Sequence, residues 1–237
     1  MKIIFEDPWI IAVEKPSGLP SHSLKTSDTS AESLLNESLA PHTALLLHRL
    51  DTGTSGVLLF AKDKNTYEKM REKFKLREIH KEYLAWTEST PDRLMRAKEL
   101  HFPQKIELPL AHHPKSAKRM IPLAPEKNAE KKLSYRGKPL PALTWIDGFR
   151  ETSWQGIASL EFKIRIPTGV MHQIRVHLKW LGFPLIGDPI YGDESSKSLA
   201  ASQRIDLGLQ AKRVEFKLNK TAYDITSHVD ASHKQAK

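Results

Sequence analysis

One short segment places an acidic side chain where a strand gives way to a turn. The sequence His48-Arg49-Leu50-Asp51 is followed by Thr52-Gly53-Thr54-Ser55-Gly56, a run of small and polar residues typical of a turn. Catalytic groups are common on loops at strand ends, so Asp51 is a candidate acid, base or nucleophile with two basic side chains just before it. A carboxylate that only caps the turn is the alternative interpretation.

A second polar segment, Thr168–His177, places His172, Gln173, Arg175 and His177 within two helical turns. His172 and Arg175 share one helix face, and Gln173 and His177 share another, because residues three or four apart are neighbours on a helix. The two histidines are five residues apart, about 140° around the helix axis. This spacing argues against a metal site, and we expect packing or hydrogen-bonding roles for both.

The composition narrows the class of protein. The 237 residues are 39% hydrophobic and 27% charged, as in ordinary soluble globular proteins. No apolar run is long enough for a membrane helix, and the N-terminus lacks the features of a signal peptide. The absence of cysteine excludes disulfides, thiolate zinc sites and cysteine nucleophiles, and is compatible with the cytoplasm. With 37 Lys and Arg against 28 acids, the charge of +9 suits a polyanionic partner or simply a basic soluble protein.

Hydrophobic patterns indicate the elements that must position these side chains. Helices are expected from a capping box at Thr29 and Glu32 to Leu39, from an Asp63 cap to about Phe74, and over His172–Leu181. Many strands, few short helices and no strand–helix alternation predict an α+β fold with a mostly antiparallel sheet. The expected strands are Ile3–Phe5, Ile10–Val13, Leu45–Leu50, Val57–Ala61, Glu82–Trp86, Leu160–Ile166 and Ala211–Leu218.

Residues 88–140 show little periodicity and include the most basic stretch of the chain. Either a solvated insertion or a segment that contacts a nucleic acid would have this composition. The polar tail from His228 to Lys237 is expected to be disordered. The cations of the basic stretch are Lys115, Lys118, Arg119, Lys127, Lys131, Lys132, Arg136 and Lys138.

Five motifs, in order over roughly residues 3–218, resemble those of the RluA-type RNA pseudouridine synthases. The segment His48–Gly56 resembles the catalytic motif of the family, and Met171–Gly192 resembles its downstream motif. The other three are Val13–Leu19, the KxYxA strand at Lys81–Ala85, and Gly137-Lys138 with Ala142 and Thr144. The chain begins at the first motif, so the small N-terminal S4 domain of many relatives is not expected.

Three positions depart from the family pattern. Val170 and Met171 stand where the family usually has Arg and a small hydroxyl residue, and Gln210 stands at a position that is often His. These departures concern backbone or substrate contacts. They leave Asp51, Tyr83 and Arg175 in place.

The resemblance implies the pseudouridine synthase fold, a long bent antiparallel sheet with short flanking helices and a central cleft, over residues 1–227 with the basic insertion at about 88–140. It implies isomerisation of uridines in structured rRNA or tRNA without cofactor or metal. Asp51 would be the nucleophile or base, and Arg175 would favour its charged form. Tyr83 would stack on the uracil, Ile174 would form an apolar wall, and Arg49 would fill the space of the extruded base.

Two other functions have to be weighed against this one. A non-catalytic RNA-binding protein or RNA chaperone on the same fold would explain the departures at Val170, Met171 and Gln210, but would not need an acid facing a phosphate backbone. A glycosidase needs paired carboxylates, and no second acid stands in a matching motif. We therefore expect a cytoplasmic, monomeric enzyme whose partner is RNA, with no membrane association. The pattern does not identify the RNA or the uridine, or whether Asp51 attacks C1′ or removes the C2′ proton.

Overall fold

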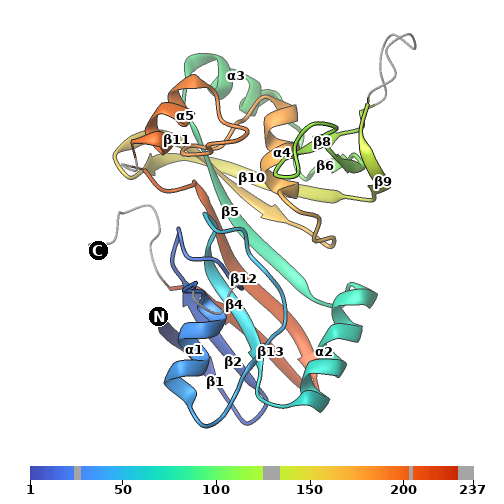
Figure 1. Ribbon diagram of the computed structural model, residues 1–237. Helices are drawn as coiled ribbons and strands as arrows, with labels where there is room; N and C mark the ends of the chain where they lie inside the picture. Colours follow the sequence, from blue (N-terminus) through green and yellow to red (C-terminus); the bar gives the residue numbers. More distant parts are fainter. Residues whose placement is uncertain (24–27, 125–133, 203–204, 229–237) are drawn as a thin grey trace. The chain divides into compact units, whose positions relative to one another are not determined.

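A computed structural model of the chain describes residues 1–23, 28–124, 134–202 and 205–228 (Figure 1). The described part contains five α-helices and thirteen β-strands, ten of which belong to the main sheet and three to a small second sheet. The chain divides into two compact units, unit 1 (residues 1–84 and 209–237) and unit 2 (residues 85–208). No helix within the described residues is long and apolar enough to cross a membrane.

Unit 1 is a sheet with two helices. Its strands pair in the order β1-β2-β4-β12, with β3 paired to β4 and β13 to β12. All of these pairings are antiparallel except that of β12 with β4. The elements are β1 (Lys2–Glu6), β2 (Ile10–Lys15), α1 (Ala31–Leu39), β3 (Leu45–Leu46), β4 (Ser55–Ala61), α2 (Lys64–Leu76), the first half of β5 (His80–Glu88), β12 (Leu209–Leu218) and β13 (Thr221–Thr226).

The parallel contact between β12 and β4 needs a glycine. Ala211 pairs with Gly56, whose φ is +107°. A Cβ on Gly56 would lie 2.2 Å from the Ala211 carbonyl oxygen. Glycine is therefore required here for its backbone conformation and for the absence of a side chain.

The core of unit 1 lies between the sheet and α2, which runs beside the strands (Figure 1). Asp63 caps α2 by accepting a hydrogen bond from the Thr66 amide at 2.9 Å, as its sequence predicts. Met70 is fully buried against β4 and β12 residues, with Tyr67 and Phe74 packed beside it. This packing supports the strands that lead into and out of the Asp51 turn.

Unit 2 combines strands of the main sheet, a small sheet and three helices. A two-residue turn at Gln155 and Gly156, both with positive φ, joins β10 to β11 as in a tight β-hairpin. The small sheet has the order β8-β7-β9. The elements are the rest of β5, α3 (Pro91–Glu99), β6 (Gln104–Glu107), β7 (Leu110–His112), β8 (Met120–Pro122), β9 (Arg136–Leu140), β10 (Leu143–Trp154), β11 (Ile157–Arg165), α4 (Gln173–Leu181) and α5 (Glu194–Ala201).

The expected α+β class with a mostly antiparallel sheet is confirmed, and three local expectations are wrong. The first helix is capped by Ser30, which makes a capping box with Ser33, rather than by Thr29. The strand expected over Leu45–Leu50 ends at Leu46, because the residues after it leave the sheet to form the Asp51 loop. The strand expected over Ala211–Leu218 begins two residues earlier, at Leu209, and a further strand, β13, follows it.

Residues 88–140 are more structured than the sequence indicated. They contain α3 and four short strands, and Ile106, Leu110 and Met120 are buried. This segment is therefore not simply a solvated insertion. Three of its cations, Lys127, Lys131 and Lys132, lie outside the described residues. So do residues 229–237 of the tail that was predicted to be disordered from His228.

Candidate active site

Asp51 lies in a turn of unit 1 that a second loop holds by backbone hydrogen bonds. The Thr54 amide donates to the Asp51 carbonyl at 2.9 Å and closes the turn. The Gly18 amide donates to the Thr52 carbonyl at 2.9 Å, and the Ser17 hydroxyl donates to the Gly53 carbonyl at 2.8 Å. The first and second sequence motifs therefore form one structure around Asp51, whose side chain is half-buried.

A fully buried lysine, Lys15, ties these loops together from within. Its Nζ donates to the carbonyls of Pro16 at 2.9 Å, Leu19 at 2.7 Å and Thr52 at 3.1 Å. Burial lowers the pKa of Lys15 to about 7, and the charge of the nearby Asp51 carboxylate opposes this shift. Lys15 therefore anchors the backbone of these loops, and its protonated form places a positive charge in the vicinity of Asp51.

Ser21 fixes the residue just before Asp51. Its buried hydroxyl accepts a hydrogen bond from the Leu50 amide at 3.0 Å and donates one to the Leu50 carbonyl at 2.9 Å. One side chain thus satisfies both backbone groups of Leu50. This contact restrains the direction in which the chain enters the Asp51 turn.

Tyr83 and His48 lie near Asp51 in the same unit. Tyr83 is buried on β5, and burial together with the Asp51 charge raises the pKa of its hydroxyl above the ordinary value. The hydroxyl is therefore neutral, and the negative charge of Asp51 contributes to the rise in its pKa. His48 Nε2 accepts a hydrogen bond from the Leu59 amide at 3.2 Å, and burial lowers the pKa of His48 to about 3. His48 is thus a neutral support of the loop.

Arg49 is the exposed member of the motif. Among the described residues it makes no ion pair. Because its neighbours Leu50 and His48 point into unit 1 and Arg49 does not, its guanidinium is available to a ligand.

The remaining predicted site residues, Ile174 and Arg175, lie on α4 in unit 2, and both are buried. Arg175 Nε and Nη2 each donate to the Asp188 carboxylate at 2.8 Å, and the guanidinium lies 5.1 Å from the Tyr191 ring centre. Burial alone would raise the pKa of Asp188, but the hydrogen bonds and charge of Arg175 lower it below the ordinary value. An ion pair between Arg175 and Asp51 stays a prediction.

Side-chain hydrogen bonds fix the N-terminal part of α4 in unit 2. Gln173 Oε1 accepts from the Thr168 hydroxyl at 2.8 Å, and its Nε2 donates to the Leu143 carbonyl at 2.8 Å. His177 Nε2 lies 3.0 Å from the Leu108 carbonyl, which can only accept, so this nitrogen carries the proton. His172 Nδ1 lies 2.9 Å from the Tyr191 hydroxyl. The expected hydrogen-bonding roles of both histidines are confirmed.

The three departures from the family pattern occupy different settings. Gln210 is buried in unit 1 and donates to the Ser227 hydroxyl at 3.0 Å, a structural contact. Val170 is half-buried against the core of the small sheet in unit 2, whereas the Met171 side chain is exposed. The described residues contain no group of three or more His, Asp or Glu side chains that could hold a metal ion.

Four residues that contact the Asp51 loop or Arg175 were not assigned roles from the sequence: Lys15, Ser21, Asp188 and Tyr191. Lys15 lies inside the first motif, and Asp188 and Tyr191 lie inside the downstream motif, so the motifs themselves carried the signal. Ser21 lies outside every motif. Only its contact with Leu50, 29 residues away, identifies it.

Comparisons with known proteins agree with this arrangement. Residues 9–180 match the family model described as RNA pseudouridylate synthase. The dual-specificity RNA pseudouridine synthase RluA of Vibrio vulnificus is 32% identical over 210 residues, which cover 87% of this chain and 74% of the relative. The tRNA pseudouridine synthase C of Haemophilus ducreyi is 28% identical over 235 residues, covering 95% and 89%.

A solved structure shares the fold. The human RNA pseudouridylate synthase domain containing 1 superposes with a TM-score of 0.74 at 20% identity, and the match covers 95% of this chain and 82% of that chain. The ordered motifs, the loops built around Asp51, the matching family model and this shared fold lead to one conclusion. This chain belongs to the RNA pseudouridylate synthase family.

Proposed function

We propose that this RNA pseudouridine synthase isomerises selected uridines of a structured transfer or ribosomal RNA, with Asp51 as its catalytic carboxylate. The observation that carries the proposal is the setting of Asp51 in unit 1. Its charge acts on the buried Lys15 and on the buried Tyr83. Lys15 Nζ, which donates to the Thr52 carbonyl at 3.1 Å, lies beside the Asp51 turn, where a cation suits a catalytic carboxylate.

The reaction breaks the bond between ribose C1′ and uracil N1 and forms a bond between C1′ and C5. The C5 proton is lost and N1 gains a proton, so the product is an isomer of the substrate and no electrons are transferred. A redox-neutral isomerisation of this kind requires no nicotinamide, flavin or ATP. The Asp51 carboxylate either attacks C1′ or removes the C2′ proton.

The other site residues have distinct proposed roles. Tyr83 stacks on the uracil, and its neutral hydroxyl can donate a hydrogen bond to it. Arg49 fills the space that the extruded base leaves in the RNA, which its exposed guanidinium supports. Ile174 forms an apolar wall against the base, and Arg175, which Asp188 holds in one orientation, is the proposed cationic partner of Asp51.

The partner of the enzyme is RNA, and the similarity to the tRNA pseudouridine synthase C of Haemophilus ducreyi supports a transfer RNA. Ribosomal RNA is the second substrate class that the proposal includes. Action as a monomer, within one catalytic domain over residues 1–227, is part of the same proposal. A cytoplasmic location is also proposed, supported by the absence of cysteine, which suits a reducing compartment.

Asp51→Asn is the decisive test. The assay measures tritium release from RNA labelled with 5-³H-uridine, which reports bond formation at C5. We expect no tritium release by Asp51→Asn once it is verified that the Asn has not deamidated to Asp. The affinity of the variant for RNA should stay within a few-fold of the wild-type affinity, because phosphate contacts dominate RNA affinity.

Asp63→Asn serves as the matched control. It makes the same change of carboxylate to amide in unit 1, at a helix cap where Asn is also favourable, and it should keep wild-type turnover. Pseudouridine formation by Asp51→Asn would exclude Asp51 as the catalytic group. Absence of turnover in the wild type on both RNA classes, with RNA binding retained, would favour the non-catalytic RNA-binding alternative.

A further inference from the structure

The small sheet of unit 2 is anchored to the helix that carries Arg175. Its inner side belongs to a buried cluster that includes Leu110, Met120 and the α4 residue Val176. The Met120 amide donates to the Tyr191 hydroxyl at 2.7 Å, so β8 is also hydrogen-bonded to the Arg175–Asp188 surroundings. Figure 1 shows α4 next to β8 within this unit. The β7–β8 loop and β9 therefore keep a fixed position relative to α4.

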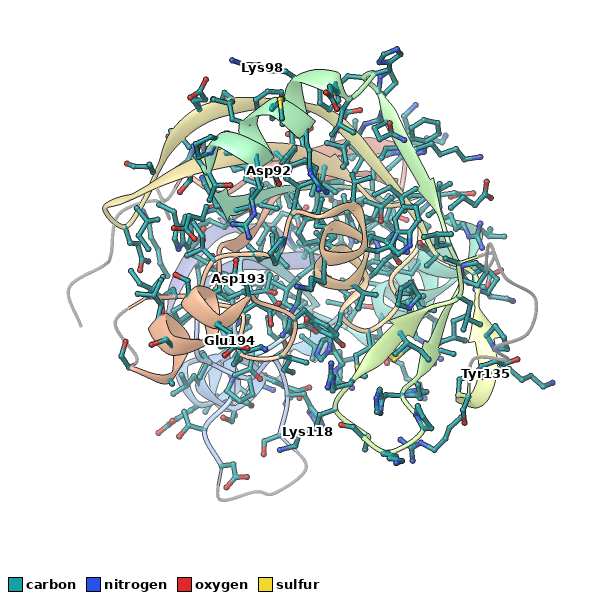
Figure 2. The ribbon with its side chains drawn as sticks, turned by 90° about the horizontal axis from the view of Figure 1, so that it is seen from above. Asp92, Lys98, Lys118, Tyr135, Asp193 and Glu194 are labelled. Carbon is teal, nitrogen blue, oxygen red and sulfur yellow. The ribbon has the colours of Figure 1, made fainter. Side chains whose placement is uncertain are left out.

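The β7–β8 loop and the edge strand β9 carry a high density of positive charge. We call this region the basic hairpin surface, which comprises the β7–β8 loop over residues 113–119 and the β9 residues 135–138. Figure 2 shows Lys118 in the loop and Tyr135 next to β9, both directed outward. No acidic residue occurs in residues 108–124 or 134–142. The surface holds five exposed cations, none ion-paired to another described residue: Lys115, Lys118, Arg119, Arg136 and Lys138.

Helix α2 in unit 1 shows what an ordinary basic surface of this chain looks like. It also has five cations, but Glu68 and Glu72 lie among them. Lys73 pairs with Glu78 at 2.8 Å, and Lys75 pairs with Glu72 at 3.5 Å. On such a mixed surface, nearby carboxylates neutralise part of the positive charge. Among the described residues, the basic hairpin surface lacks such acids, so no described carboxylate within it offsets its positive charge.

The surface also has a hollow suited to an anionic group. A cavity of about 300 Å³ is lined by His112, Ala117, Arg136 and Gly137. Arg136 Nε donates to the His113 carbonyl at 3.1 Å, which fixes the guanidinium. Its two terminal nitrogens have no hydrogen-bond acceptor among the residues that the structure describes. A planar guanidinium held in this way binds a phosphate oxygen pair readily.

An aromatic side chain stands beside these cations. Tyr135, which is 41% exposed, immediately precedes Arg136. Cations that track a phosphate backbone together with an exposed aromatic ring are the combination that binds single-stranded nucleic acid, because each base can stack on the ring. An acidic protein surface would use the cations but not the exposed ring in this way.

We infer that the basic hairpin surface binds the phosphodiester backbone of the RNA substrate, in nucleotides outside the target uridine. This inference rests on the proposed function, since the polyanion is taken to be the RNA that reacts at Asp51. It assigns part of RNA selection to a surface of the catalytic domain itself. Arg136 and the hollow beside it hold one phosphate, and the loop cations hold its neighbours.

The test is the salt dependence of RNA binding by the variant Lys115→Gln/Lys118→Gln/Arg119→Gln, followed by fluorescence anisotropy with a labelled RNA. Each lost phosphate contact lowers the slope of log K against log salt by roughly 0.7–0.9, so the slope should flatten by about 2. Between 50 and 200 mM salt the wild type should then lose about 16-fold more affinity than the variant. KM should rise, while kcat at saturating RNA should be retained, which also verifies folding.

Arg136→Gln tests the hollow separately and should flatten the slope by roughly 0.7–0.9. The matched control removes three exposed cations of α2 instead, as Lys64→Gln/Arg71→Gln/Lys75→Gln, and should change the slope by less than about 0.7. If both triple variants flattened the slope equally, the effect would come from the net charge of the protein and not from this surface, and the inference would be overturned. An unchanged slope in the hairpin variant would overturn it as well.

The inference and the proposed function can fail separately. If the wild type releases no tritium from any RNA but the hairpin variant still flattens the slope, the surface binds RNA and the proposed function fails. If the wild type turns over and the hairpin variant binds RNA like the wild type at every salt concentration, the inference fails and the proposed function stands.

Discussion

The Arg175–Asp188 ion pair allows a prediction about burial, because the chain contains an exposed pair of the same geometry. Asp188 is 0% exposed and Arg175 is 5% exposed, with two contacts of 2.8 Å. Asp224 and Arg213 also make two parallel contacts, of 2.6 Å each, but are 56% and 34% exposed. The two pairs therefore differ in solvent access, and Arg213 also has a second partner, Glu215, at 3.1 Å.

Asp188→Asn should destabilise the protein by roughly 3–5 kcal/mol, because it removes the negative charge that receives two hydrogen bonds from a buried guanidinium. The amide oxygen can still accept from the Ile190 and Tyr191 amides, so those two hydrogen bonds add little to the cost. Asp224→Asn should cost only about 0–1 kcal/mol, since water solvates both partners. Urea unfolding at pH 7, followed by circular dichroism, measures the two free energies of unfolding.

The pH dependence gives an independent check. The pKa of Asp188 is lower in the folded chain than in the unfolded chain, so its contribution to stability is present above about pH 4 and is lost as pH falls through the folded pKa. The difference between wild type and Asp188→Asn should therefore narrow below about pH 4. Equal costs for the two variants at pH 7, or a difference that does not narrow in acid, would refute the reasoning.

Two further predictions concern the loops around Asp51. Ser21→Ala should lower the free energy of unfolding by about 2–4 kcal/mol and lower kcat, because the Leu50 amide and carbonyl both lose their partner. Ser17→Ala removes only one hydrogen bond and should lower the free energy of unfolding by about 1 kcal/mol. Urea unfolding and tritium release measure both variants, and equal effects of the two would contradict this prediction. For Lys15, the folded pKa of about 7 lies below the unfolded value, so the unfolded chain binds more protons between about pH 7 and 10 and the wild-type stability should rise over this range. Lys15→Met should show a smaller rise in urea unfolding at pH 7 and 9.5, because burial also lowers the pKa of Lys81, to about 8, and this part of the rise remains. An equal rise in both proteins would show that Lys15 does not contribute to it.

The sequence predicted elements with a regular period and missed those without one. Residues 160–166 alternate cleanly, and residues 160–165 belong to β11; the Asp63 cap marks the start of α2. Strand β9 is exposed on every residue, so no burial pattern marks it, and a bulge between Ile146 and Gly148 interrupts β10. Periodicity reports a buried face, and an element without one regular buried face leaves no such signal.

The candidate site was predictable only to the extent that its residues lie within motifs. Asp51, Arg49 and Tyr83 were identified from motif resemblance, and the structure adds the exposure of Arg49 and the influence of the Asp51 charge on Tyr83. The anchoring of the Asp51 loop by Lys15 and Ser21 depends on contacts between residues 37 and 29 positions apart. No local pattern contains such contacts, because they arise only when the chain folds back on itself.

The discontinuous composition of unit 1 has a consequence for synthesis on the ribosome. The strand that pairs in parallel with β4 at Gly56 is β12, which begins at Leu209, after all of unit 2. A nascent chain that has emerged only through residue 208 holds every residue of unit 2, but the β4 edge beside Gly56 still lacks its partner. Since domains tend to fold as they emerge, unit 2 can mature while unit 1 waits for its last two strands. The turn that carries Asp51 therefore gains its complete sheet only near the end of translation, and a prematurely terminated chain would carry the catalytic motif without the fold that supports it.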